Sequence, residues 1–89
     1  MKKYKNALKC FDKAIELRPE YAYALNNKGY TLYSLGKHKE ALKYIDTSLK
    51  IDPSNVYAWR NKALNCILYL YVDTVVITSA NSKHAAYCN

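Results

Sequence analysis

Glycine and proline are scarce in this 89-residue chain, which contains two residues of each. Both residue types interrupt regular backbone structure, so their scarcity argues against a fold of many short strands and tight turns. It favours a few long helices. A chain of this length has room for one small domain, and its single core is stable only if the elements around it are regular.

Cysteine is also sparse and badly placed for a structural role. The three residues, Cys10, Cys66 and Cys88, lie far apart and form no CxxC pair. An odd number of distant cysteines predicts neither a disulfide framework nor a zinc site, and favours reduced thiols in a cytoplasmic protein. His38 and His84 have no plausible metal-ligand companions. We therefore expect no metal and no cofactor.

Long apolar runs are missing as well. The N-terminus is basic, but no apolar run of signal-peptide length follows it, so no secretory signal is predicted. The most apolar stretch, residues 63–80, is interrupted by Asn65 and Asp73. These polar residues and its modest length predict no transmembrane helix.

Catalytic constellations are absent from the sequence in the same way. Its seven acidic residues are scattered, and no pair suited to acid–base catalysis stands out. Residues 29–37 superficially resemble a phosphate-binding loop, but six residues separate the two glycines where that motif has four. His38 also follows Lys37 where serine or threonine is required. We expect no enzymatic activity.

What the chain does contain is an internal repeat. Residues 18–29 match residues 52–63 at an offset of 34, and the same offset pairs residues 5–12 with residues 39–46. A fixed period of this size is typical of a helical solenoid or array. The recurring pairs in the first match are Pro19 and Pro53, Tyr23 and Tyr57, Ala24 and Ala58, Asn27 and Asn61, and Lys28 and Lys62.

Apolar residues recur at intervals of three and four, which predicts helices. The pattern places them at residues 3–17, from 20 or 21 to 35, at 38–51, and from about 56, where Ser54 or Asn55 caps the start. Gly36 is the predicted terminator of the second helix. Gly29 lies inside that helix, where it costs about 1 kcal/mol relative to alanine, so we expect a neighbouring helix to pack closely against it. Short connections make such helices antiparallel, which gives an all-α stack of helical hairpins.

This pattern resembles the tetratricopeptide repeat, a helix–turn–helix unit of about 34 residues. Residues 22–55 resemble a complete unit, with Leu25 and Gly29 at its large and small apolar sites. Residues 2–21 resemble the second helix of a preceding unit, and residues 56–69 the first helix of a following one. The resemblance implies a short right-handed solenoid of antiparallel helical hairpins.

The sequence departs from the family pattern in two places. Lys28 and Lys62 occupy a site that is commonly leucine in the family, and we expect their stems to pack while the ammonium groups reach water. Residues 70–89 lack the turn glycine, the alanine and the terminal proline that the register requires. This divergent tail is open to three interpretations: a natural extension, a degenerate repeat or a truncation.

The resemblance implies a non-catalytic protein-binding module whose first helices line a concave groove for a peptide or a partner helix. Tyrosine offers contact area with a polar tip, asparagine can hydrogen-bond a peptide backbone, and Arg60 can pair with a carboxylate of an acidic partner. Some members clamp a C-terminal carboxylate; Asn61 fits that set, but Asn26 and Tyr30 do not, so this clamp is not predicted. The candidate partner-binding residues are Tyr23, Asn26, Asn27, Tyr30, Tyr33, Tyr57, Arg60 and Asn61.

Two other functions remain open at this stage. Repeat arrays generally need about three units and polar caps, so the ends of this one are expected to associate with a second copy or to be covered by residues 72–89. The chain would then be a structural or self-associating fragment with no dedicated client. A nucleic-acid surface is the other candidate, but its lysines and the tyrosines lie on different faces, which argues against it. The lysines concerned are Lys5, Lys9, Lys13, Lys39 and Lys43.

Overall fold

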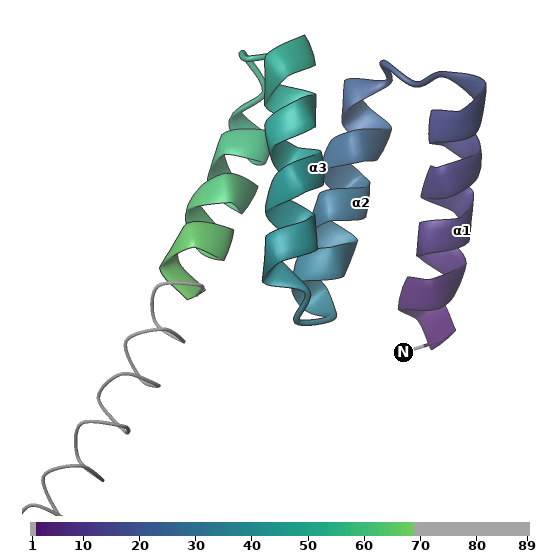
Figure 1. The fold of residues 1–89 in the computed structure, drawn as a ribbon, viewed down its shortest axis with the longest axis horizontal. Helices are drawn as coiled ribbons and strands as arrows, with labels where there is room; N and C mark the ends of the chain where they lie inside the picture. The colour runs from purple at the N-terminus through teal and green to yellow at the C-terminus, as the bar shows by residue number, and fades with distance from the viewer. Residues whose placement is uncertain (1, 69–89) are drawn as a thin grey trace, which may run out of the picture.

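A computed structural model describes residues 2–68, which form four helical segments placed side by side, each antiparallel to the next (Figure 1). Helix α1 spans Lys2–Leu17, α2 spans Ala22–Ser34 and α3 spans His38–Ile51, and residues 56–68 are helical. No strand occurs among these residues. The all-α prediction is confirmed, and the tail 70–89 lies outside the described residues.

The turns between the helices use the residues that the sequence marks for them. Gly36 adopts a φ of +82°, in the left-handed region that glycine enters without strain. The Gly36 amide donates to the Tyr33 carbonyl at 3.0 Å and the Lys37 amide to the Leu32 carbonyl at 2.9 Å. This pair of bonds is a Schellman motif, which satisfies carbonyls at the end of α2 and turns the chain toward α3.

The core lies between α2 and α3 and extends to the helical segment 56–68. Close approach of α2 and α3 depends on Gly29: a Cβ atom there would lie 2.5 Å from Ile45 Cγ1 and 3.0 Å from the Ala41 carbonyl oxygen. The expected packing reason for this glycine is therefore confirmed. The buried apolar cluster consists of Leu32, Ala41, Ile45, Leu49 and Ala58.

The two lysines at the leucine site each pair with a carboxylate of the preceding helix. Lys28 forms an ion pair with Asp12 of α1 and donates a hydrogen bond to the Tyr44 hydroxyl of α3 at 3.2 Å. Its side chain is 16% exposed, so most of it is packed, and the pairing with Asp12 was not predicted. Lys62 repeats the arrangement with Asp46 at 3.0 Å, as an ion pair without hydrogen-bond geometry, and keeps more solvent contact. The junction of α1 with α2 and that of α3 with the segment 56–68 thus carry the same pair, 16 residues apart in sequence.

Burial and pairing act in opposite directions on Lys28. Burial lowers the pKa of the ammonium group, but hydrogen bonds to Asp12 and Tyr44 outweigh it, so the pKa is raised above its ordinary value. A raised pKa means that the charged lysine stabilises the fold at neutral pH. That contribution is complete below the ordinary pKa of about 10.4 and is lost as the pH rises through the higher folded value.

Asp12→Asn is expected to lower the free energy of unfolding by about 0.5–1 kcal/mol at pH 7, because the carboxylate that pairs with Lys28 is half exposed. The difference from the unchanged chain should begin to shrink near the ordinary lysine pKa of about 10.4, where Lys28 of the unfolded chain loses its proton, and should vanish above the raised folded pKa. Urea unfolding followed by circular dichroism at several pH values measures this difference. Glu16→Gln, which alters only an exposed pair with Lys13, is the control. A difference that stays constant through pH 11.5 would contradict the assignment.

Candidate partner-binding groove

A groove of about 530 Å³ lies between α2 and the helical segment 56–68. It is open on one side, and both walls come from first helices of the repeat, since residues 56–68 follow the α2 pattern at an offset of 34. Its lining residues are Tyr23, Asn26, Asn27, Tyr30, Asn55, Tyr57, Arg60 and Asn61. All candidate residues except Tyr33 are therefore brought together in one cavity.

Helical spacing explains the α2 wall. Tyr23, Asn27 and Tyr30 are separated by four and three residues, so they share one side of the helix. The opposite side carries Leu25 and Leu32, each 3% exposed, which hold α2 in the core. The two groove tyrosines remain exposed. Packing on one side of α2 thus fixes a rigid row of polar and aromatic groups on the other.

Two buried asparagines form the floor and link the walls. The Asn61 side-chain amide donates to the Asn26 side-chain oxygen at 3.0 Å, and both residues are 4% exposed. Asn65 donates to the Asn61 backbone carbonyl at 2.9 Å. A buried amide–amide bond in a place of low polarity is costly to break, because each group would then lose its partner. Asn26 and Asn61 therefore set the width of the groove more than they offer contacts to a ligand.

The second wall depends on a helix cap. The Asn55 side-chain oxygen accepts from the Tyr57 amide at 3.0 Å and the Ala58 amide at 3.3 Å, which starts the helix and directs Tyr57 and Arg60 into the groove. The Arg60 guanidinium carbon lies 5.6 Å from the centre of the Tyr57 ring. The sequence marked Asn55 as a possible cap but not as part of the wall. Its place two residues before Tyr57 was the available signal.

Tyr33 lies outside the groove. Its half-buried side chain packs against the core, with its ring centre 5.9 Å from that of Tyr30 and 5.5 Å from that of His38. Tyr33 is the last tyrosine of α2, and the turn to α3 covers it. Ser34, on the expected groove side, donates its hydroxyl to the Tyr30 carbonyl at 3.1 Å and does not line the cavity.

Comparison with protein-family models identifies the repeat. A model described as "Tetratricopeptide repeat" matches residues 22–55, and one described as "TPR repeat" matches residues 1–36. The two matches together cover residues 1–55, which is more than half of the chain. The chain belongs to the tetratricopeptide repeat family. The search of curated proteins found no match.

Membership of the tetratricopeptide repeat family indicates a protein–protein interaction module in general, since these repeats are usually non-catalytic. The first match runs from the first residue of α2 to the cap residue Asn55, so it contains α2, the turn at Gly36 and α3. The groove therefore lies between the first helix of this matched repeat and the helix that follows it.

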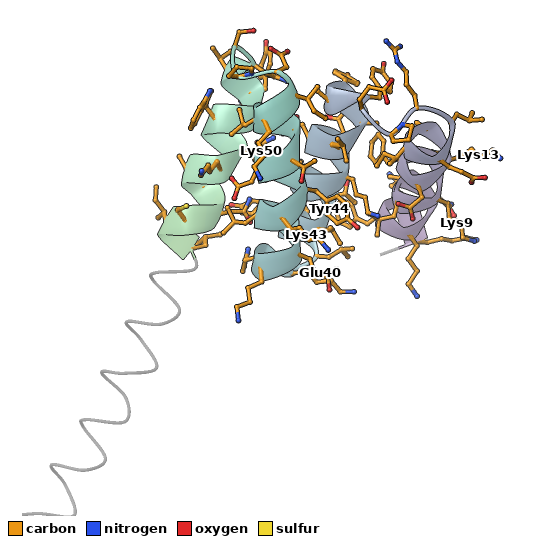
Figure 2. The ribbon with its side chains drawn as sticks, turned by 45° about the horizontal axis from the view of Figure 1, so that its top comes forward. Lys9, Lys13, Glu40, Lys43, Tyr44 and Lys50 are labelled. Atoms are coloured by element: carbon orange, nitrogen blue, oxygen red, sulfur yellow. The ribbon has the colours of Figure 1, made fainter. Side chains whose placement is uncertain are left out.

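The basic surface of this tetratricopeptide array lies on other helices than the groove. Lys9 and Lys13 project from α1 away from the other helices, while Lys43 extends from α3 (Figure 2). The five lysines named above are all exposed. Among the described lining residues of the groove, Arg60 is the one charged group. The groove tyrosines and these five lysines thus occupy separate faces, as expected.

The same part of the chain bears on metal binding and on membrane insertion. Residues 2–68 contain no group of three histidine, cysteine, aspartate or glutamate side chains placed to hold a metal ion. None of their helices combines the length and the apolar character needed to cross a bilayer.

Proposed function

We propose that the groove between α2 and the helical segment 56–68 binds an extended peptide with acidic side chains, presented by a protein partner in the cytoplasm. The observation that supports this most is the lining itself: tyrosines and asparagines around a single cation, Arg60, with no acidic group among the described lining residues. A peptide carboxylate can pair with Arg60, and charge-assisted bonds of this kind are the stronger ones.

The chemistry of the walls suits a peptide backbone. Tyr23 and Tyr30 present large surfaces with hydroxyl tips at little entropic cost, because tyrosine has only two rotatable side-chain bonds. Asn27 is half buried beside them and carries both a donor and an acceptor, which matches the alternating groups of an extended peptide. The floor is held by the Asn26–Asn61 bond, so the ligand meets a preformed site. Preformed sites lose less entropy on binding.

A library of random twelve-residue peptides, displayed and selected against the chain, tests the proposal. Selected sequences are expected to be rich in aspartate and glutamate. Their affinities are then measured by fluorescence anisotropy. The variant Tyr23→Ala, Asn27→Ala, Tyr30→Ala is expected to bind them about 10- to 100-fold more weakly, since truncation of central tyrosines costs about 2 kcal/mol or more.

A matched control separates groove binding from attraction to a basic protein. Tyr4→Ala with Thr47→Ala removes one exposed tyrosine and one exposed polar residue outside the groove and should leave the affinity unchanged. Arg60→Ala should reduce both the affinity and its dependence on salt. Circular dichroism confirms that each variant is folded. Selection of basic peptides, or equal binding by the triple variant, would refute the proposal.

A further inference from the structure

The helical segment 56–68 carries an apolar face that is far less covered than its counterpart on α2. Trp59 is 49% exposed, whereas Leu25, 34 residues earlier, is 3% exposed. Ala63 is exposed, whereas Gly29 is buried. On α2 these positions pack against α3. We call Trp59, Ala63 and Cys66 the trailing face.

Helix α1 carries the complementary surface. Phe11 and Ala7 are partly exposed, whereas their counterparts in α3, Ile45 and Ala41, are completely buried. No residue of α1 reaches full burial. In α3 these positions pack against α2. We call Ala7, Phe11 and Ala14 the leading face.

We propose that the trailing face of one copy binds the leading face of a second copy, in the register in which α2 packs against α3. Such a contact repeats the interface between α2 and α3, because the trailing face corresponds to the α2 side of that interface and the leading face to the α3 side. Since the two faces differ and lie at opposite ends of the helical row, the contact is head-to-tail and leaves one free face at each end (Figure 1). This inference does not depend on the function proposed for the groove.

One facing pair differs from its counterpart within the chain. Within the chain, a Cβ atom at Gly29 would meet Ile45 Cγ1 at 2.5 Å and the Ala41 carbonyl oxygen at 3.0 Å. Between copies, Ala63 replaces Gly29 and Phe11 replaces Ile45. The methyl group of Ala63 therefore requires these two helices to lie slightly farther apart than α2 and α3 do.

The aromatic ring beside the lysine differs between Lys28 and its repeat counterpart Lys62. Lys28 lies 4.2 Å from the centre of the Tyr44 ring, which comes from the following helix. Lys62 instead lies 5.6 Å from the ring of Trp59 in its own helix. In α1 the counterpart of Tyr44 is the small residue Cys10. In the proposed contact, Cys10 of the second copy lies near Lys62 and offers no aromatic ring. Trp59, on the same helix as Lys62, supplies the ring instead.

A hollow of about 400 Å³ lies beside Trp59 and Lys62, next to the trailing face. Its other lining residues, Asp46, Leu49 and Lys50, belong to α3. One repeat earlier, Tyr44 contacts Lys28, which is paired with Asp12.

Two features make this contact weaker than its counterpart within the chain. The Ser48 hydroxyl donates to the Ala22 carbonyl at 2.8 Å between α3 and α2, and Ala14 stands at the position of Ser48 in α1. The formal net charge of +7 also makes copies repel one another. Because salt screens that repulsion, association is expected to strengthen as the ionic strength rises.

Complementation between two blocked variants tests the proposal with the full chain. Phe11→Glu blocks the leading face and Ala63→Glu blocks the trailing face. The unchanged chain should show an average mass in sedimentation velocity that grows with concentration beyond a dimer, and more so at 0.5 M salt. Each variant alone should be monomeric. A mixture in equal amounts should form a dimer that grows no further, since only one matched pair of faces remains.

Thr47→Glu, at an exposed site on α3 outside both faces, is the control and should associate like the unchanged chain. Circular dichroism verifies that all three variants stay helical. A monomeric unchanged chain at every concentration and salt would overturn the proposal, as would a mixture that fails to dimerise.

Cross-linking checks the register without adding charge. A Cβ atom at position 29 lies 2.5 Å from Ile45 Cγ1, and a carbon–carbon bond is about 1.5 Å long, so the two Cβ atoms lie within about 4 Å of each other. That separation suits a disulfide. With the three native cysteines changed to alanine, a chain with Ala63→Cys mixed with a chain with Phe11→Cys should form a disulfide-linked dimer on oxidation.

Lys13→Cys in place of Phe11→Cys is the control, because Lys13 is exposed on α1 outside the leading face. It should cross-link at least tenfold less. Equal cross-linking by the control, or dimers formed by the Ala63→Cys chain alone, would exclude this register.

Discussion

Ile45→Ala is expected to lower the free energy of unfolding by about 2–5 kcal/mol, the largest effect of any single substitution considered for this chain. Ile45 is fully buried and belongs to the apolar cluster between α2 and α3. Truncation removes three carbon atoms from the contact with Gly29 and leaves a cavity that rigid helices fill only in part. Small domains are stable by only about 5–15 kcal/mol, so a large part of the total would be lost.

Urea unfolding followed by circular dichroism measures this loss. Thr47→Ala is the control, because Thr47 lies on the same helix with its side chain exposed, and its substitution should change stability by less than about 0.5 kcal/mol. A loss below 1 kcal/mol for Ile45→Ala would show that α2 and α3 are not packed as described.

Gly29→Ala is expected to have the second largest effect, a net loss of up to about 2 kcal/mol. Alanine favours a helix by about 1 kcal/mol over glycine, which alone would stabilise the protein. The added methyl group, however, would meet Ile45 Cγ1 at 2.5 Å and the backbone oxygen of Ala41 at 3.0 Å. Overpacking of this kind costs about 1–3 kcal/mol, and a backbone atom cannot rotate away. Thermal and urea unfolding provide the measurement.

Combining the two substitutions distinguishes steric conflict from a general intolerance of alanine at this site. In the Ile45→Ala background the shortest contact is gone and the contact with the Ala41 carbonyl oxygen remains, so Gly29→Ala should cost clearly less there than in the unchanged chain. The double-mutant cycle should give a favourable coupling energy of about 1 kcal/mol or more. Purely additive effects would contradict the contact between Gly29 and Ile45.

Periodicity within the sequence was enough to predict the helices, and the resemblance to the tetratricopeptide repeat supplied most of the groove residues. The preference of glycine for helix ends located the turn at Gly36, and its cost inside a helix predicted the close approach at Gly29, both of which the structure reproduces. Spacing along α2 also grouped Tyr23, Asn27 and Tyr30 on one side. These features depend on positions within one helix or one repeat, where helical geometry leaves few choices.

Contacts between helices were harder to foresee. The prediction for Lys28 considered its own helix alone. Nothing in the periodicity of α2 shows that Asp12 of α1 lies close enough to Lys28 to form an ion pair. The recurrence of both residues as Asp46 and Lys62 at the same offset was the available signal. Asn26 was expected to contact a ligand, yet the neighbouring helix covers it through Asn61. Such burial depends on how adjacent helices are tilted, which a single helix pattern does not contain.

The Asn26–Asn61 bond also has a mechanical consequence. It connects helices that belong to successive repeats, at the place where a solenoid must open or close if it is to stretch. Pulling the array apart would break this buried bond before the apolar contacts on the outer side separate. This single hydrogen bond between two amides therefore resists separation of the two helices. Replacing it with alanine would change the elasticity of the array more than its secondary structure.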